Sequence, residues 1–265
     1  MKASIPVAVL GLGGRMGQAV VSVLASTTTE LQFSGGWCRD TEGLSGLPLG
    51  DTAVVSTDLD EALAGARVAI DFTLPEATAR VAAACERAQC ALVTGVTGLT
   101  PTLVAALDVA AQSIPVLHAT NMSAGAHLLM HLAGRAAAAL DEAAWDAEVL
   151  DVHHRDKRDA PSGTALSLGE AIASARGRRL DDVRQDGADG RMRGEVPGAI
   201  GFTAQRGGGV VGEHTVSFLG NFECVELKHR ATDRRVFADG ALRAARWIAG
   251  RKPGRYTMQQ VLGLS

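Results

Sequence analysis

The sequence feature that most constrains the fold is an apolar run followed at once by closely spaced glycines. Residues 7–10 form a short apolar stretch, and Gly11, Gly14 and Gly17 follow before an apolar helical pattern begins. A strand that turns tightly into a helix presents backbone N–H groups to an anion, and glycine lets a phosphate approach that backbone. The pattern therefore predicts a dinucleotide-binding unit, although Met16 stands where the usual motif has its third glycine.

Strand and helix patterns alternate through the rest of the first half. Strand patterns lie at residues 31–37, 53–55, 68–72, 91–94 and 115–118, and helical patterns lie at residues 59–64 and 75–88. This alternation predicts an α/β fold with a parallel sheet. Thr73 is expected to cap the helix that begins near Pro75.

The second half has a different pattern. Alternating apolar runs at residues 147–152, 198–206, 210–218 and 223–229 predict an open sheet. Residues 177–194 are charged and irregular, which predicts an exposed loop, and residues 237–248 form an amphipathic helical pattern.

One polar stretch joins groups that bind and protonate anions. It contains His153, His154, Lys157, Ser162, Gly163 and Thr164. The histidines follow a predicted strand, with His153 accessible to solvent, and Ser162 is expected to cap the next helix, whose N–H groups and dipole favour an anion. We interpret the stretch as a site that holds a carboxylate or phosphate beside Lys157. The alternative is a solvated histidine pair, a surface lysine and an ordinary helix start.

The composition excludes several classes of protein. An apolar fraction of 46% in 265 residues allows one large or two modest cores and argues against disorder. The formal net charge is −3 with no long basic run, so we expect no nucleic-acid partner. No uncharged apolar stretch reaches about 18 residues, and no apolar leader precedes the first strand. We therefore expect a soluble, cytoplasmic protein without a membrane partner.

Neither the cysteines nor the histidines form a recognisable metal motif. The four cysteines form no CxxC pair, so we expect free and mostly buried thiols. His127 and His131 are four residues apart, but no intervening glutamate or third ligand accompanies them. The sequence therefore predicts no metal site.

These motifs resemble those of the 4-hydroxy-tetrahydrodipicolinate reductase family, also called dihydrodipicolinate reductase, of lysine and diaminopimelate biosynthesis. Residues 153–164 are the most specific match. The similarity extends over nearly the whole chain, through residues 14–17, 71–75, 95–98, 119–125, 211–214 and 237–245.

The resemblance implies reduction of a cyclic imine dicarboxylate with NADPH or NADH. It implies a Rossmann-like dinucleotide-binding domain formed by residues 1–123 and 235–265. It also implies an α+β domain for substrate binding and oligomerisation, residues 124–234, whose open mixed sheet forms the interface of a homotetramer.

The resemblance also assigns roles to particular residues. His153 is the proton donor or acceptor, and Lys157 is a second proton donor. Substrate binding is expected from His154, Ser162, Gly163, Thr164 and Thr97. Cofactor binding is expected from Gly11, Leu12, Gly13, Gly14, Arg15, Met16, Arg39, Gly95, Val96, Thr97, Ala119, Thr120, Asn121 and Met122.

Two positions depart from the family pattern. Cys38 stands where family members carry an acid that would bind the ribose hydroxyls, and Arg39 follows it. Arginine pairs with a 2′-phosphate, which favours NADPH. Val96 replaces a threonine in the glycine turn at residues 95–98, which removes a hydroxyl from that turn.

Two other functions compete with this prediction. A semialdehyde dehydrogenase would need a nucleophilic cysteine with a histidine partner, and no cysteine lies in such a motif. A redox sensor would keep the glycine turn but would have no use for His153 together with Lys157. Turnover of NAD(P)H that depends on substrate separates an enzyme from a sensor.

Overall fold

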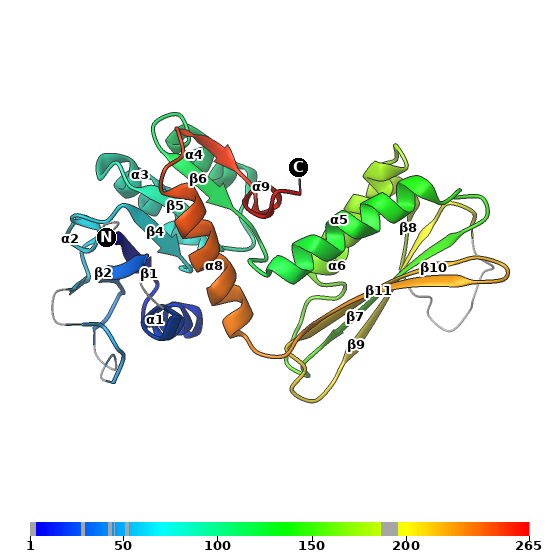
Figure 1. Ribbon diagram of the computed structural model, residues 1–265, viewed down its shortest axis with the longest axis horizontal. Helices are drawn as coiled ribbons and strands as arrows, with labels where there is room; N and C mark the ends of the chain where they lie inside the picture. Colours follow the sequence, from blue (N-terminus) through cyan, green and yellow to red (C-terminus); the bar gives the residue numbers. More distant parts are fainter. Residues whose placement is uncertain are drawn as a thin grey trace. The chain divides into compact units, whose positions relative to one another are not determined.

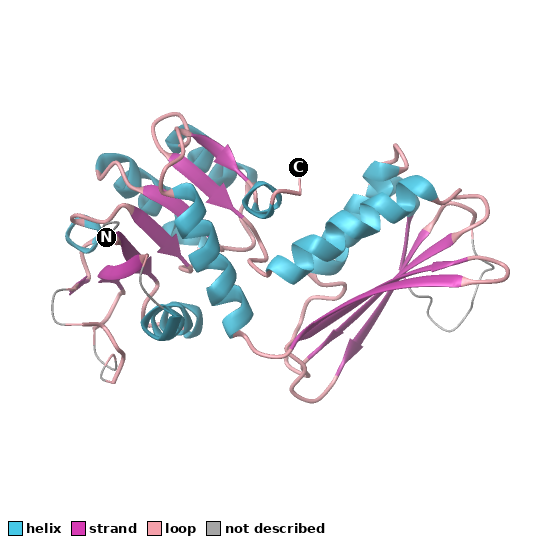
Figure 2. Cartoon of the chain, viewed as in Figure 1, coloured by secondary structure: helices cyan, strands magenta, loops and turns pink. Residues whose placement is uncertain are grey.

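A computed structural model describes residues 4–27, 30–41, 44, 46–50, 53–186 and 196–264. The chain divides into two compact units (Figures 1 and 2). The first unit comprises Met1–Ala124 and Arg235–Ser265, and the second comprises Gly125–Arg234. Within the described part of the chain, no helix is long and apolar enough to cross a membrane.

The first unit is built on a seven-stranded sheet with the order β12-β6-β5-β4-β1-β2-β3. Every neighbouring pair in this sheet is parallel, which confirms the predicted α/β fold. The strands are β1 (Ile5–Leu10), β2 (Leu31–Trp37), β3 (Val54–Ser56), β4 (Val68–Asp71), β5 (Ala91–Thr94), β6 (Pro115–His118) and β12 (Gly254–Tyr256). Strand order reverses between β1 and β4, and the crevice at such a reversal is where α/β sheets bind nucleotides.

Helices cover both faces of this sheet, so its strands are apolar on both sides (Figure 1). Val7 and Val9 of β1 pack in one core cluster with residues of α1 (Arg15–Thr27), α8 (Arg235–Ile248) and α9 (Met258–Leu262). Ala8 and Leu10 point to the opposite face. There they pack in a second cluster with residues of α2 (Leu59–Leu63), α3 (Thr78–Arg87) and α4 (Pro101–Ala110).

Two details of the first unit differ from the sequence-based prediction. Thr73 does not cap a helix, because Leu74 occupies the N-cap position of the 3-10 helix η1 (Pro75–Ala77) and makes no side-chain cap. The Thr73 backbone N–H is instead donated to Asp71 Oδ1, 2.9 Å away. The terminal elements β12 and α9 were not predicted; β12 is short and extends the sheet by pairing with β6.

The second unit has a five-stranded mixed sheet with the order β11-β10-β7-β9-β8. Its strands are β7 (Asp146–His153), β8 (Arg184–Asp186), β9 (Ile200–Arg206), β10 (Gly212–Leu219) and β11 (Cys224–Ala231). β10 is antiparallel to both β7 and β11, whereas β9 is parallel to β7 and β8. The predicted open sheet is therefore confirmed.

The predicted loop at residues 177–194 is wrong where the structure describes it. This region contains α7 (Leu180–Val183) and the edge strand β8, and residues 187–195 lie outside the described residues. Val183 is buried in the core, and the Arg184 guanidinium lies 5.7 Å from the Phe202 ring centroid. Contacts with a distant strand thus order a segment whose own sequence is charged and irregular.

Two helices, α5 (Ala124–Ala139) and α6 (Gly163–Ala175), contribute to a single core cluster with the second sheet. Alternate residues of β7, such as Ala147 and Val149, are buried in this cluster. The residues between them, including Glu148 and Leu150, are only half-buried. One face of the sheet therefore carries the core and the other lacks a covering layer within the described part of this unit.

Candidate active site

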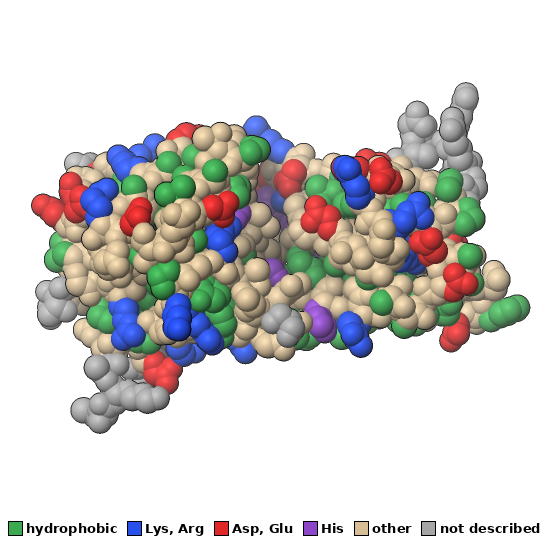
Figure 3. All heavy atoms as spheres, turned by 90° about the horizontal axis from the view of Figure 1, so that it is seen from above, with side chains coloured by type: hydrophobic (Ala, Val, Ile, Leu, Met, Phe, Trp, Pro, Cys, Tyr) green, Lys and Arg blue, Asp and Glu red, His purple; other side chains and the backbone are tan. Residues whose placement is uncertain are grey.

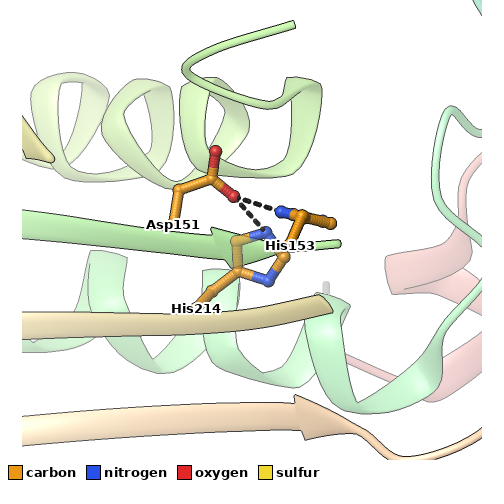
Figure 4. Close-up of side chains that lie close together, drawn as sticks. All are labelled: Asp151, His153 and His214. Atoms are coloured by element: carbon orange, nitrogen blue, oxygen red, sulfur yellow. Dashed lines mark ion pairs between the residues drawn. The ribbon is translucent and has the colours of Figure 1, made fainter. Parts of the chain in front are cut away.

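A buried carboxylate and two imidazoles lie together in the second unit (Figure 4). Asp151 and His153 are two residues apart on β7, so their side chains point to the same face. His214 on β10 is the direct cross-strand partner of Asp151. His153 Nδ1 lies 2.7 Å from Asp151 Oδ1, and His214 Nε2 lies 3.4 Å from the same oxygen. The strand pairing therefore brings both imidazoles to one carboxylate.

The other carboxylate oxygen of Asp151 is held from two further directions. The backbone N–H of Ser162 is donated to Asp151 Oδ2 over 2.7 Å, and Arg206 Nη2 lies 2.9 Å from that oxygen. Arg206 is on β9 opposite His153, and it also donates to the carbonyl oxygens of Asp151 and Asp159. These contacts fix the orientation of the carboxylate.

The pKa of Asp151 is set by competition between burial and its partners. Burial alone would raise the pKa of this carboxyl group. Hydrogen bonds from His153, His214, Arg206 and the Ser162 N–H outweigh burial and hold the pKa of Asp151 well below its usual range. Asp151 is therefore an anion throughout the neutral pH range.

The start of α6 joins this cluster. Ser162 Oγ accepts the backbone N–H of Ala165, which confirms the predicted N-cap, and it lies 3.2 Å from His214 Nε2. Ser162 is buried, whereas Gly163 at the first helical position is exposed with open space around the position of a Cβ. The N-terminus of α6 therefore places an accessible backbone turn beside a buried charged cluster.

The cluster resembles a metal site in spacing only. One ligand atom each from Asp151, His153 and His214 can be chosen within 4.8 Å of one another. However, the Arg206 guanidinium occupies Asp151 Oδ2, and its positive charge opposes a divalent cation at the same carboxylate. The geometry fits a hydrogen-bonded charge cluster better than a metal centre.

The first unit presents its own ligand-binding edge where the parallel strands end. Gly11 follows β1 with a positive φ of 84°, and a Cβ there would lie 2.7 Å from the Phe72 carbonyl oxygen. A Cβ at Gly17 would overlap the Gly11 carbonyl oxygen. Only glycine fits these two positions, so the turn keeps the N-terminus of α1 close to β1 and open to an anion.

A second turn at this edge is held by Asp71 at the end of β4. Thr94 Oγ1 donates to Asp71 Oδ2 over 2.9 Å, and the Val96 backbone N–H is donated to Thr94 Oγ1 over 3.3 Å. His118 Nε2 lies 2.9 Å from the Val96 carbonyl oxygen. Burial lowers the pKa of His118, only partly offset by its hydrogen bond to Val96. A neutral network therefore fixes the turn at residues 95–98.

Comparison with known proteins identifies the family. Residues 5–122 match the family described as "Dihydrodipicolinate reductase, N-terminus", and residues 125–262 match "Dihydrodipicolinate reductase, C-terminus". The chain belongs to the dihydrodipicolinate reductase family. This confirms the resemblance found in the sequence.

Individual relatives match over their full length. The chain is 45% identical to the 4-hydroxy-tetrahydrodipicolinate reductase of Alkalilimnicola ehrlichii, over 97% of this chain and 98% of the relative. It is 46% identical to the enzyme of Ruegeria pomeroyi, with the same coverage. Among solved structures, the dipicolinate-bound dihydrodipicolinate reductase from Paenisporosarcina sp. TG-14 has a TM-score of 0.78 at 23% identity, covering 97% of this chain and 99% of that one. At that identity it supports the fold.

The predicted catalytic residues of this dihydrodipicolinate reductase family member lie in different surroundings. His153 is the last residue of β7 and is only 8% exposed, so the expectation of a solvent-accessible imidazole is wrong. It is buried because it lies on the same face of β7 as Ala147, Val149 and Asp151, which are also buried. His154 follows and is half-buried. Lys157 Nζ lies 2.9 Å from Asp159 Oδ1, so its ammonium is paired within its own loop.

The predicted cofactor residues fall into two groups by exposure. The side chains of Leu12, Val96 and Met122 are buried in the first unit, and Ala119 is nearly so. These positions can face a dinucleotide only through their backbone. The exposed residues of the set are Gly13, Gly14, Arg15, Arg39, Thr97 and Thr120, and the half-buried ones are Gly11, Met16, Gly95 and Asn121. Asn121 Oδ1 accepts the Ser123 N–H over 2.8 Å.

The residues that follow β2 bear on cofactor choice. Cys38 is buried, and burial raises the pKa of its thiol. It therefore offers no negative charge to a ribose hydroxyl at neutral pH. Arg39 and Asp40 are both exposed beside it. With Cys38 in place of the family's acidic residue, Arg39 and Asp40 are the exposed charged groups that follow β2.

The cysteines argue against the semialdehyde dehydrogenase alternative. Cys38, Cys85 and Cys90 are buried and Cys224 is exposed, and all four are free thiols, as expected. The pKa of Cys85 is raised, chiefly by its hydrogen bond with Cys90 and then by burial. Burial and a raised pKa suppress the thiolate that such a mechanism requires.

Three residues of the cluster were not predicted as site residues: Asp151, Arg206 and His214. Asp151 had a signal in the sequence, because it alternates with His153 in a strand pattern and must share its face. His214 lay in a segment that resembles the family, but no role was assigned to it. Arg206 had no local signal, since only the parallel pairing of β7 with β9 brings it to Asp151.

Acidic and basic side chains are mixed on the surface. Figure 3 shows acidic and basic side chains on both units, separated by uncharged surface. Several exposed arginines pair with nearby carboxylates, for example Arg87 with Asp60 and Arg184 with Asp186.

Proposed function

We propose that the Asp151 cluster and the glycine turn of the first unit together carry out the reaction of the family. That reaction is the NAD(P)H-dependent reduction of 4-hydroxy-tetrahydrodipicolinate to tetrahydrodipicolinate, in the diaminopimelate pathway of lysine biosynthesis, and full-length matches at 45% and 46% identity assign it to this chain. The protein is a nicotinamide-dependent oxidoreductase. The observation that carries the site proposal is the buried His153, which is paired with a carboxylate and is followed four residues later by Lys157 and then by the open start of α6 at Gly163.

The substrate has two carboxylates, and the second unit offers groups that suit them. Lys157 supplies an ammonium, His154 an imidazole, and the start of α6 at Gly163 and Thr164 supplies backbone N–H groups with the positive end of the helix dipole. The hydroxyl and N–H of Ser162 are already used within the cluster, so its role is to hold the helix start in place. A substrate carboxylate would replace Asp159 as the partner of Lys157.

The first unit suits a dinucleotide because its glycine turn after β1 has no space for side chains at Gly11 and Gly17. The positions around Gly11 and Gly17 exclude a Cβ, so the pyrophosphate would lie on the N–H groups at the start of α1. Gly95, Val96, Thr97 and residues 119–122 would line the same edge. Bound NAD(P)H supplies the hydride that reduces the conjugated ring.

Residues of this chain then donate the proton that the reaction requires. Loss of the 4-hydroxyl group as water gives the conjugated ring, and hydride addition to that ring leaves an enamine-like anion that needs a proton at carbon. We assign His153 as proton donor, because an imidazolium can act as a general acid, and Lys157 as the group that holds a carboxylate and assists protonation. Thr97, which is exposed at the cofactor edge, is assigned to the substrate as well.

Arg39 favours NADPH over NADH in this proposal. Its guanidinium is exposed next to a buried, uncharged Cys38, where a 2′-phosphate on the adenosine ribose would pair with it. An acidic residue at position 38 would instead bind the ribose hydroxyls. NADH remains a second cofactor because the pyrophosphate turn does not distinguish the two.

The assembly and the location are also part of this proposal. We assign one face of the second sheet to the interface of a homotetramer, since alternate β7 residues such as Glu148 and Leu150 are half-buried and no helix among the described residues covers that face. Light scattering of the purified chain measures this state directly, and a monomer at working concentration would reject it. Its biosynthetic role supports a cytoplasmic location.

A coupled assay tests the function. The condensation product of pyruvate and aspartate semialdehyde is generated in situ, and NADPH or NADH consumption is followed with the purified chain. We expect consumption only when that product is present, and faster consumption with NADPH. Binding of NADPH without turnover would favour the sensor alternative. A His153→Gln variant, which keeps size and polarity but cannot donate a proton, is the matched control.

A further inference from the structure

We propose that Asp151 is a positioning residue that keeps the Nδ1 proton of His153 in place, so that His153 exchanges protons with the substrate through Nε2 alone. This rests on the proposed function of His153 as proton donor. His153 Nδ1 lies 2.7 Å from Asp151 Oδ1, at ion-pair distance from that carboxylate. The negative charge of the carboxylate stabilises a proton on Nδ1, and Nε2 is then the nitrogen left to react.

The carboxylate is suited to this role because it cannot turn away. Asp151 Oδ2 accepts the Ser162 N–H over 2.7 Å and lies 2.9 Å from Arg206 Nη2, so only Oδ1 faces the imidazoles. Arg206 is itself tied to the backbone carbonyls of Asp151 and Asp159. Contacts with β9 and the start of α6 thus anchor Asp151 on β7, next to His153.

The other ring nitrogen of His153, Nε2, lies beside a glycine and not beside the Asp151 carboxylate. Gly212 lies beside His153 on the adjacent strand β10, and a Cβ at this position would be 3.0 Å from His153 Nε2. The absence of a side chain at Gly212 keeps space next to Nε2. Nδ1 of His153 consequently lies beside a buried anion, whereas Nε2 faces space that a side chain at position 212 would reduce.

Charged and titratable groups from several elements lie around His153. Asp151 on β7 is an anion at 2.7 Å, whereas His214 on β10 lies farther from the shared oxygen, at 3.4 Å. Arg206 on β9 contacts the opposite oxygen of Asp151. His229 on β11 stacks on His214, and burial followed by the influence of His214 lowers the pKa of His229. The Lys157 and Asp159 pair in the adjoining loop is neutral overall.

The proton balance of the step is simple. The Nε2–H bond of the imidazolium breaks as the new C–H bond forms on the substrate anion, and the bonding electrons become the Nε2 lone pair. The Nδ1 proton stays between His153 and Asp151. Water then returns a proton to Nε2. Asp151 remains a carboxylate throughout, because its pKa lies far below the pH of the reaction.

The tautomer of neutral His153 can be measured in the wild-type enzyme. Nitrogen-15 spectra of histidine-labelled protein distinguish a proton on Nδ1 from one on Nε2, and the His153→Gln variant assigns the signal. We expect the Nδ1–H tautomer at alkaline pH. A proton on Nε2 would overturn the proposal, whether or not the enzyme reduces the expected substrate. If the Nδ1–H tautomer is observed but the enzyme does not reduce the expected substrate, the proposed function alone is rejected.

The second test is the steady-state kinetics of an Asp151→Asn variant. A neutral amide no longer stabilises a proton on His153 Nδ1, so acid catalysis should weaken and kcat should fall at least about tenfold. We expect KM for NADPH to stay unchanged, because the cofactor turn lies in the other unit.

The matched control is Asp186→Asn, which removes an exposed carboxylate paired with Arg184 in the same unit. It should leave both kcat and KM for NADPH unchanged. An Asp151→Asn enzyme with a wild-type kcat would contradict the proposal, and so would one in which KM for NADPH rises in parallel with the fall in kcat, because that pattern indicates a general structural defect. If Asp151→Asn does not fold, the wild-type tautomer decides.

Discussion

Among the described residues, each unit buries one carboxylate at or near the end of a strand, and the pKa values of the two groups are shifted in opposite directions. Asp71 ends β4 and accepts the Thr73 N–H and the Thr94 hydroxyl, both over 2.9 Å. Asp151 lies near the end of β7 and faces Arg206 together with two histidines. Burial raises the pKa of Asp71 in spite of its hydrogen bonds, whereas the pKa of Asp151 lies well below its usual range.

The difference shows what a cation adds to a buried carboxylate. Hydrogen bonds from neutral donors at Asp71 do not offset the loss of water, but a guanidinium and two imidazoles at Asp151 do. The neutral network around Asp71 is suited to holding a backbone turn for a cofactor. The charged cluster around Asp151 is suited to moving a proton, because it keeps an anion beside a titratable group.

The largest expected effect lies in the charged unit. Lys157→Ala should lose the contact with a substrate carboxylate, roughly 1.5 to 3 kcal/mol, or about ten- to 150-fold in kcat/KM. A lost role in protonation adds to this, and such roles contribute about 10² to 10⁴. We expect kcat to fall even at saturating substrate while NADPH affinity, measured by fluorescence titration, stays near wild type.

A normal kcat and KM for Lys157→Ala would contradict the proposed mechanism. Loss of NADPH binding would instead show that the two parts of the site are misassigned. His153→Gln should cause a fall in kcat of the same kind, because the buried position of His153 limits replacement of its proton by solvent.

A pair of stability variants compares the two carboxylates directly. Arg206→Met leaves a buried anion with fewer partners, and breaking a buried ion pair typically costs about 3 to 5 kcal/mol. Thr94→Val removes one neutral hydrogen bond to Asp71 and should cost about 1 to 3 kcal/mol. Denaturant unfolding combined with hydrogen exchange in each unit measures both. Equal losses would remove the distinction between the charged and the neutral network.

Arg39 is the residue proposed to distinguish the two cofactors at the edge of the first unit. Arg39→Ala should weaken NADPH binding by roughly 1.5 to 3 kcal/mol, because a charge-assisted bond to the 2′-phosphate is lost, and should affect NADH much less. Dissociation constants for both cofactors give the answer. The converse variant, Cys38→Glu, should improve NADH binding. If Arg39→Ala weakens both cofactors equally, Arg39 does not bind the phosphate.

The helix start of the second unit is tested by Gly163→Val. A side chain at this position meets open space within the described structure, so the fold should persist while access of a carboxylate to the N–H groups of α6 is obstructed. We expect KM for the substrate to rise several-fold, by up to about 1 kcal/mol in binding, as for a helix-dipole contact. Thermal unfolding is the control. An unchanged KM reduces this segment to an ordinary helix cap.

The smallest expected effect is the pH dependence of stability, where the two carboxylates should have opposite signs. The folded pKa of Asp151 is depressed, so its contribution is present above the unfolded pKa of about 3.9 and is lost as pH falls below it. The folded pKa of Asp71 is raised, so its contribution is present below about 3.9 and is lost as pH rises through the folded value. Asp71→Asn should therefore gain stability relative to wild type from pH 3 to about 7, and Asp151→Asn should lose it. The same sign for both variants would contradict the comparison.

Local sequence determined the elements that depend on near neighbours. The glycines at 11, 14 and 17, the alternation of β7 and the cap at Ser162 are each specified within a few residues, because backbone conformation and capping are short-range effects. The α/β fold of the first unit and the open sheet of the second followed from hydrophobic periodicity. The family motif pointed to the loop that contains Lys157.

Only the tertiary structure decided which side chains complete the charged cluster. Asp151, Arg206 and His214 lie on three strands, and strand pairing alone brings them together. The same holds for the order of α7 and β8, which depends on packing against Phe202, and for β12, which needs β6 as a partner. Burial of His153 was equally invisible in the sequence, since a polar residue at a strand end is buried only when a distant partner compensates its loss of water.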